Sequence, residues 1–174
     1  MIGRRTFVGA GLAAAAAGTA ITVPRWRNNG PWRFFTPHEA ATVDAISEQL
    51  IPADRDPGAR QANVVNYIDI QLTRPFKRYQ RAYRQGLAAV DGASRARFSR
   101  RFIELAAGEQ TAVLADIEKD ANAFFELILA HTRQGFYGDP RHGGNRDRVS
   151  WKMLKLPFPQ VCGRMHYDDQ PKTV

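Results

Sequence analysis

The chain has 174 residues and a formal net charge of +8, and 44% of its residues are hydrophobic. This length suits one domain with its own hydrophobic core. The single cysteine, Cys162, excludes an internal disulfide and any cysteine-based zinc or iron–sulfur cluster. Its thiol is either buried and inert or bridged to another chain.

Two adjacent arginines, Arg4 and Arg5, precede a weakly apolar, alanine-rich stretch at residues 10–23. Together with Phe7, this pattern is typical of a twin-arginine export signal, which addresses a route for proteins that are already folded. The fourteen uncharged residues are fewer than the roughly 20 that span a bilayer as a helix. We therefore expect a periplasmic protein with a signal peptide over residues 1–23, either cleaved after Ala20 or kept as a tether.

The next segment, residues 24–35, combines two prolines and a glycine with four aromatic side chains. The turn-forming residues predict a linker, and the aromatic residues predict that part of it packs on the domain. A capping box at Thr36 and Glu39, with Pro37 at the first helical position, then predicts a helix that stops at Ile51 and Pro52.

Apolar residues at helical spacing predict five further helices, beginning near residues 64, 75, 98, 113 and 124. Turn-forming residues at 91–94 predict a break, and Gly108 and Gly135 predict helix ends. No stretch alternates persuasively with period two. The predicted fold is therefore all-α, a compact bundle of five to six helices followed by a long irregular arm.

Positive charge is concentrated between residues 74 and 101, where nine basic residues are opposed only by Asp91. Such a patch can bind nucleic acid, but the chain carries no nucleic-acid recognition motif and an exported protein seldom meets any. An acidic protein surface or anionic lipid head groups suit the patch better. The alternative is a solvated helix face that keeps the protein soluble.

Residues 136–160 are rich in turn formers and aromatic side chains, which predicts an irregular arm held in place as a functional loop. Residues 161–174 follow as a C-terminal tail. Within the arm, Asn145 and Asp147 are expected to hydrogen-bond backbone groups that hold the turn.

Residues with catalytic chemistry are scattered. None of the four histidines lies at a metal-ligand spacing from another histidine or from cysteine, and the loop around Asp54 and Asp56 lacks the distal glutamate of a calcium loop. His142 beside Asp139 forms either a proton-transfer couple or ordinary hydrogen-bonded loop structure. No nucleophile elbow, dinucleotide fingerprint or haem-attachment motif is present. We predict no catalytic, cofactor-binding or metal-binding residue in this chain.

Short motifs along the whole domain resemble the small subunit (subunit 3, or gamma) of gluconate 2-dehydrogenase and related membrane-bound dehydrogenases. The more specific ones are Gly-Phe-Tyr-Gly-Asp-Pro at 135–140, Gly-Gly-Asn-Arg-Asp at 143–147, Trp-Lys at 151–152 and Phe-Pro at 158–159. Others are the segments 35–39, 50–52 and 57–59. Together they cover roughly residues 34–160.

The resemblance implies a large FAD-dependent catalytic partner of the glucose–methanol–choline type, commonly with a c-type cytochrome subunit that carries haem. It also implies that the partner lacks an export signal and travels, folded, with this chain through the twin-arginine translocation machinery. The small subunit then serves export, maturation and stability. The alternatives are a subunit that contributes directly to catalysis, with His142 and Asp147 as candidates, and a free-standing periplasmic basic module.

Docking to the partner is assigned to the arm, because its aromatic residues exceed what a bare loop needs. The candidate residues are Tyr137, Asn145, Asp147, Trp151, Lys152 and Phe158. Trp151 is the expected anchor, since buried aromatic residues dominate interface energetics, and Lys152 is expected to pair with an acidic group. The alternative for Trp151 is that it closes the core of this domain.

Overall fold

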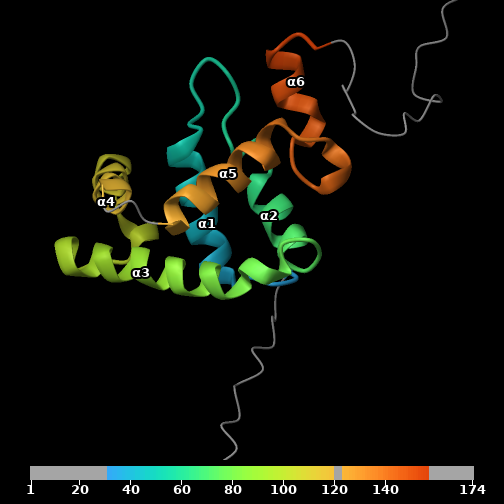
Figure 1. Ribbon diagram of the computed structural model, residues 1–174. Helices are drawn as coiled ribbons and strands as arrows, with labels where there is room; N and C mark the ends of the chain where they lie inside the picture. The colour runs from blue at the N-terminus through green and yellow to red at the C-terminus, as the bar shows by residue number, and fades with distance from the viewer. Residues whose placement is uncertain (1–30, 120–122, 157–174) are drawn as a thin grey trace, which may run out of the picture.

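A computed structural model gives the structure of residues 31–119 and 123–156. These two stretches form six α-helices and contain no strand, which confirms the predicted all-α fold (Figure 1). The helices are α1 (Pro37–Leu50), α2 (Val64–Leu72), α3 (Gln80–Phe98), α4 (Ala107–Lys119), α5 (Ala123–Tyr137) and α6 (Val149–Met153). Short 3-10 turns are η1 (Lys77–Tyr79), η2 (Phe102–Glu104), η3 (Pro140–His142) and η4 (Arg146–Arg148). The expected signal peptide and the tail at 161–174 lie outside the described residues.

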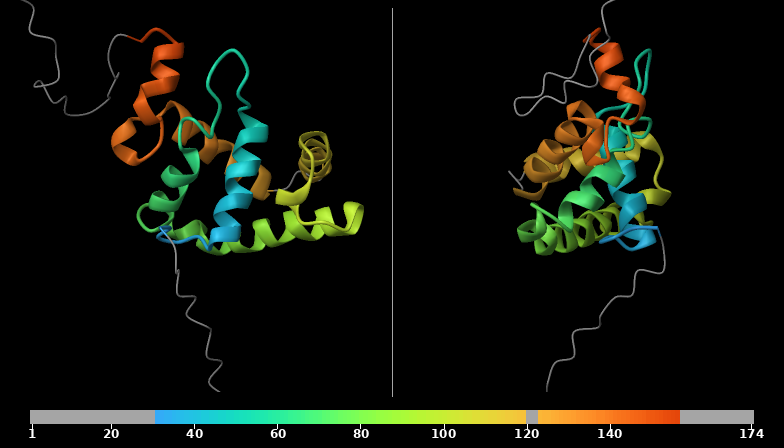
Figure 2. Two further views of the ribbon diagram at one scale, coloured as in Figure 1. Left: turned by 180° about the vertical axis from the view of Figure 1, so that it is seen from behind. Right: turned by 90° about the vertical axis from the view of Figure 1, so that its right-hand side faces the viewer.

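Helix α5 crosses α1 and runs beside α2, while α3 forms the lower edge of the molecule and α6 its upper end (Figures 1 and 2). The core fills the space between these helices. Its fully buried apolar residues include Val43, Ile46, Ile68, Leu72, Tyr83 and Ile128. Phe124 and Phe125 are also buried, as the sequence predicted.

The start of α1 is capped as predicted. The Thr36 hydroxyl accepts a hydrogen bond from the Glu39 main-chain N–H, and the Glu39 carboxylate accepts one from the Thr36 N–H at 2.8 Å. The segment before it is tied down by Asp69 of α2, which is 1% exposed. The Asp69 carboxylate accepts the main-chain N–H groups of Arg33, Phe34 and Phe35 at 2.7–3.0 Å. The last part of the predicted linker thus packs on the domain, as expected.

The predicted break at residues 91–94 is wrong, because α3 runs without interruption from Gln80 to Phe98. The turn-forming side chains are used elsewhere. Asp91 is buried and binds groups on α1 and η2, and Gly92 faces open space, where a Cβ atom would contact nothing. The helix also begins later than residue 75, after the 3-10 turn η1. Tertiary contacts here override local propensity.

Two predicted helix ends are likewise wrong. Gly108 lies in the first turn of α4, whose start is capped by a Glu109 carboxylate that accepts the Ala106 N–H at 2.8 Å. Gly135 lies inside α5, and a Cβ atom there would sit 2.9 Å from the Tyr67 ring. Gly135 therefore permits close packing of α5 on α2.

Candidate functional site

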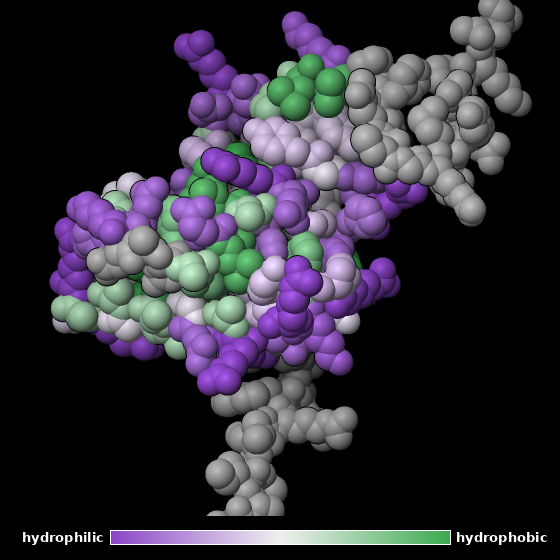
Figure 3. Space-filling view, in the orientation of Figure 1, coloured by the Kyte–Doolittle hydropathy of each residue, from purple (hydrophilic) through white to green (hydrophobic). Residues whose placement is uncertain are grey.

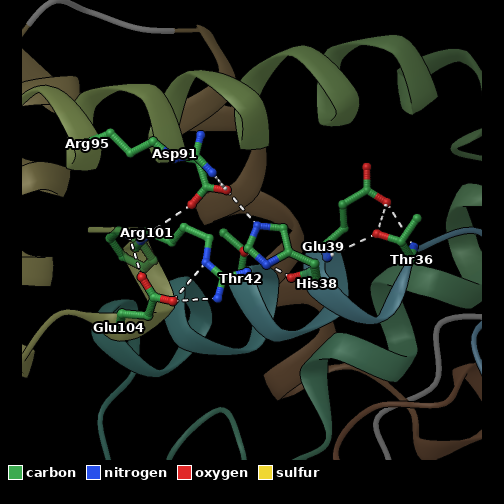
Figure 4. A network of polar contacts seen from close by, with 9 residues as sticks. Thr36, His38, Glu39, Thr42, Asp91, Arg95, Arg101 and Glu104 are labelled. Atoms are coloured by element: carbon green, nitrogen blue, oxygen red, sulfur yellow. Dashed lines mark hydrogen bonds and ion pairs between the residues drawn. The ribbon is translucent and has the colours of Figure 1, made fainter. Parts of the chain in front are cut away.

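A pocket of about 350 Å³ opens between the N-terminal half of α1 and the middle of α3. Its chemistry-bearing side chains are Thr36, His38, Glu39, Thr42, Arg84, Asp91 and Arg95, with Leu87 and Ala88 as an apolar part of the wall. The side chains converge because α1 and α3 pack against each other here (Figure 4).

One side of the pocket carries a histidine–aspartate couple. His38 Nε2 lies 2.5 Å from Asp91 Oδ2, and Asp91 Oδ1 accepts the main-chain N–H of Phe102 at 3.1 Å. The Asp91 side chain is 9% exposed and that of His38 is 36% exposed, so the carboxylate is the more buried member of the couple. Arg95, one turn along α3, has its guanidinium nitrogen 3.8 Å from the same carboxylate.

The other side carries the ion pair between Glu39 and Arg84, which is half-buried. Arg84 also donates to the main-chain oxygen of Phe34 at 2.9 Å and lies 4.3 Å above the Phe34 ring. Burial lowers the pKa of the Arg84 guanidinium. Each cation is thus already engaged with a carboxylate, and the main consequence of this network is to fasten α1 to α3.

Sequence reasoning did not single out the His38–Asp91 couple, since 53 residues separate the two side chains. Beside this couple, the Thr42 hydroxyl donates to the main-chain oxygen of His38 at 3.0 Å. That bond is the ordinary use of a threonine within a helix.

A second candidate surface is the C-terminal arm, described over residues 138–156. Asn145 is fully buried; its amide donates to the Gly138 oxygen at 3.0 Å, and its side-chain oxygen accepts the Ser150 N–H at 3.1 Å. Trp151 is 9% exposed, and its indole N–H donates to the Tyr137 oxygen at 2.9 Å. Asn145 therefore holds the turn as predicted, whereas Asp147 is exposed and its carboxylate makes no hydrogen bond to the backbone among the described residues. The indole of Trp151 closes onto its own domain, which is the alternative that the sequence left open.

The arm is fixed to the bundle by several hydrogen bonds. Asn145 N donates to the Gly135 oxygen of α5 at 2.8 Å, and Asn66 of α2 donates to the Gly143 oxygen at 2.7 Å. Gly144 allows this contact, because a Cβ atom there would lie 2.2 Å from the Gly135 oxygen. The arm is therefore a braced element with its own 3-10 turns and α6.

The remaining predicted docking residues are exposed where they are described. Tyr137 is 46% exposed, and Lys152 and Asp147 also face solvent; Phe158 lies outside the described residues. Their docking role stays a prediction. Two residues that the sequence reasoning missed accompany them, Leu154 at 50% and Leu156 at 40% exposed. The sequence could have indicated their exposure, because leucine alternates with lysine at residues 154–156, just after the buried Trp151.

The Asp139 side chain binds Arg141, and not the ring of His142, the partner that the sequence left open. The Asp139 carboxylate accepts the Arg141 main-chain N–H at 2.9 Å and pairs with the Arg141 guanidinium at 2.8 Å. Burial alone would raise the pKa of Asp139, but these contacts to Arg141 lower it overall. His142 is exposed, and its main-chain oxygen accepts from Gln71 at 3.3 Å. These contacts are those of hydrogen-bonded loop structure.

Within residues 31–119 and 123–156, no three His, Cys, Asp or Glu side chains gather closely enough to hold a metal ion. None of the helices in that part of the chain is both long and apolar enough to cross a membrane.

Comparison with known proteins gives a family assignment. Neither a curated protein nor a solved structure matches the chain. The family described as gluconate 2-dehydrogenase subunit 3 matches residues 37–157, from the first residue of α1 to just beyond the described arm. This match covers well over half of the chain and includes the described arm and all of the pocket residues except Thr36. The chain therefore belongs to the gluconate 2-dehydrogenase subunit 3 family, whose members are small subunits of a dehydrogenase complex with catalytic partner subunits.

Proposed function

We propose that this chain is the non-catalytic small subunit of a periplasmic FAD-dependent dehydrogenase of the glucose–methanol–choline type. It carries the folded catalytic subunit through twin-arginine export and then stabilises it. In this proposal FAD belongs to the catalytic partner, and any c-type haem belongs to a cytochrome subunit. The substrate is chosen by the catalytic partner.

The observation that carries the proposal is the apolar surface of the arm. Among the described residues, the large hydrophobic side chains that are exposed are Tyr137, Leu154 and Leu156, and all three lie at this one end of the molecule. Figure 3 shows hydrophobic side chains gathered at the top, over the end of α6. Exposed apolar residues concentrated in one place and rimmed by polar ones are typical of protein interfaces. Lys152 and Lys155 supply such a rim.

The bracing of the arm supports the same function. Asn145 and Trp151 fix the backbone that presents the exposed residues, so little conformational entropy is lost when a partner binds. A surface organised before binding suits a subunit that must stay attached to its partner during export.

Export is tested by changing both Arg4 and Arg5 to lysine in cells that also express the catalytic subunit. We expect this chain and the dehydrogenase activity to stay in the cytoplasm, with the fold of the domain unchanged. Cell fractionation with activity assays measures this. Periplasmic activity at the normal level in the double variant would contradict the carrier function.

Docking is tested by the triple variant Tyr137→Ser, Leu154→Ser, Leu156→Ser, with co-purification of the catalytic subunit as the measurement. The matched control changes three exposed alanines elsewhere, Ala89, Ala96 and Ala130, to serine. We expect the arm variant to lose the catalytic subunit while its melting temperature stays near that of the control. Equal recovery of the catalytic subunit with both variants would remove the arm as the docking surface.

A further inference from the structure

The basic segment between residues 74 and 101 divides into two groups in the structure. Five of its nine cations have a carboxylate partner: Arg84 with Glu39, Arg95 with Asp91, Arg97 with Asp116, Arg100 with Glu109 and Arg101 with Glu104. These five belong to the internal ion-pair network of the domain. The other four are Arg74, Lys77, Arg78 and Arg81, which we call the basic face.

The basic face has no carboxylate of its own. None of its four side chains lies within 4 Å of an Asp or Glu among the residues that the structure describes, and no acidic residue occurs between Thr73 and Val90. All four residues are exposed. These four positive charges therefore face solvent and form no ion pair within the described part of the domain.

The four cations also lie close together in the chain. They occur at spacings of three, one and three residues, from the turn after α2 through η1 to the second residue of α3. Within this segment Lys77 N donates to the Arg74 oxygen at 3.2 Å. Beneath them Phe76 and Tyr79 pack on the core, and the Arg78 guanidinium lies 4.6 Å above the Tyr79 ring. The basic face thus rests on a fixed aromatic base.

The position of the basic face in the molecule points to its partner. It lies at the entry to α3, which forms the lower edge in every view, and the described chain also begins at that edge (Figures 1 and 2). The segment that precedes residue 31 contains the uncharged stretch 10–23. Helix α6, at the end of the arm, lies at the opposite, upper end. The start of the arm contacts the last turn of α2, where Gln71 donates to the His142 oxygen at 3.3 Å. A protein approaching a membrane with its N-terminal edge would present the basic face first.

We infer that the basic face docks this subunit on an anionic lipid surface through head-group phosphates. None of the four residues lines any of the three described pockets, and all four are exposed. Exposed cations without a carboxylate partner match the diffuse charge of a lipid layer better than the fixed acidic groups of a protein. The inference is independent of which catalytic subunit the arm binds.

The test is co-sedimentation of the full chain with vesicles of phosphatidylcholine containing 30% phosphatidylglycerol, over a range of salt concentrations. The basic-face variant changes Arg74, Lys77, Arg78 and Arg81 to glutamine. A matched control removes an equal number of positive charges elsewhere, by changing four exposed arginines to glutamine. These are Arg55, Arg133, Arg146 and Arg148. A third variant keeps the charge but changes the three arginines of the basic face to lysine.

We expect binding that weakens with salt and falls on the order of 100-fold or more in the basic-face variant, since each cation near the surface contributes separately. The control and the lysine variant should stay within a few-fold of the natural chain, because lipid binding needs charge at this place and not bidentate geometry. Melting temperatures of all variants should agree, since the changed side chains are exposed.

Three results would overturn the inference. Equal weakening in the basic-face variant and the control would show that only net charge matters. Vesicle binding that survives loss of the basic face would show that another part of the chain binds lipid. Loss of catalytic-subunit capture, with vesicle binding intact, would make the basic face a contact for an acidic protein.

Discussion

His131 predicts a specific loss of stability in mild acid. It lies in α5 at 3% exposure, stacked on the Phe76 ring at a centroid distance of 4.1 Å. Its Nδ1 is 2.9 Å from the hydroxyl of the buried Tyr83. Burial, and secondarily the charge of Arg78, lowers the pKa of His131 from 6.5 to about 4. The imidazole is therefore neutral in the folded protein at pH 7, and its Nδ1 shares a hydrogen bond with the Tyr83 hydroxyl.

The size of the effect follows from proton linkage. The unfolded chain binds a proton at His131 near pH 6.5, whereas the folded chain binds it only near pH 4. Between these values the unfolded state holds more protons, so the free energy of unfolding falls as the pH is lowered and stops falling below about 4. At about 1.4 kcal/mol for each unit between the two pKa values, the loss from this residue reaches about 3 kcal/mol.

The assay compares the natural full chain with His131→Gln by urea denaturation from pH 7 to pH 4. Glutamine cannot titrate but keeps an oxygen acceptor for Tyr83. The unfolding free energy of His131→Gln should therefore fall less steeply as the pH is lowered. At pH 7 it should be lower than that of the natural chain, because the ring stacked on Phe76 is lost. His142→Gln, at an exposed position, is measured alongside as the control for replacing a histidine with glutamine. Equal slopes for the natural chain and His131→Gln would refute the reasoning, because His131 would then titrate alike when folded and unfolded.

Three further substitutions test the packing around the two surfaces. Asp69→Asn should cost about 2–4 kcal/mol of unfolding free energy in urea titrations and expose the segment at 31–35 to protease, because buried main-chain N–H groups lose charged acceptors. Gly86→Ala should cost about 1–3 kcal/mol or more, because its Cβ would lie 2.1 Å from the Phe124 ring; in a Phe124→Ala background that cost should shrink. Asn145→Ala should raise amide hydrogen exchange at Ser150 well before global unfolding, because the arm loses the bond that caps its last helix.

The elements that the sequence predicted correctly depend on local signals. The capping box at Thr36 and Glu39 places the start of α1, and apolar spacing locates the buried faces of α2, α3 and α5. Both signals act within a few residues. The turn chemistry of a short polar residue in a glycine-rich loop gave a further correct prediction in the arm, where Asn145 holds the turn.

The errors came from residues whose role is set by distant contacts. Asp91 and Ser94 look like turn formers, but both are buried inside a continuous helix, and Asp91 is engaged by His38, 53 positions earlier. Gly135 looks like a helix end, yet its missing side chain makes room for Tyr67. No local pattern distinguishes a glycine that ends a helix from one that lets another element approach. The His38–Asp91 pocket was missed for the same reason.

Helix α5 connects the two surfaces that we assign to different partners. Its first turn packs Phe124 on Gly86 of α3, the helix that carries the end of the basic face, and its last turn accepts the arm at the Gly135 oxygen. The two surfaces lie apart in the fold, because α6 is at the upper end of the molecule and the entry to α3 is at its lower edge (Figure 1). Substitutions at separated surface sites combine additively when the core between them is undisturbed.

This separation gives a last prediction. A chain that carries both the basic-face variant and the triple serine variant of the arm should lose vesicle binding as much as the first alone, and catalytic-subunit capture as much as the second alone. Each loss is measured by its own assay, co-sedimentation and co-purification, on the same protein preparation. If losing the arm residues also weakened vesicle binding, the two surfaces would be coupled, and the partner subunit would contribute to the lipid contact.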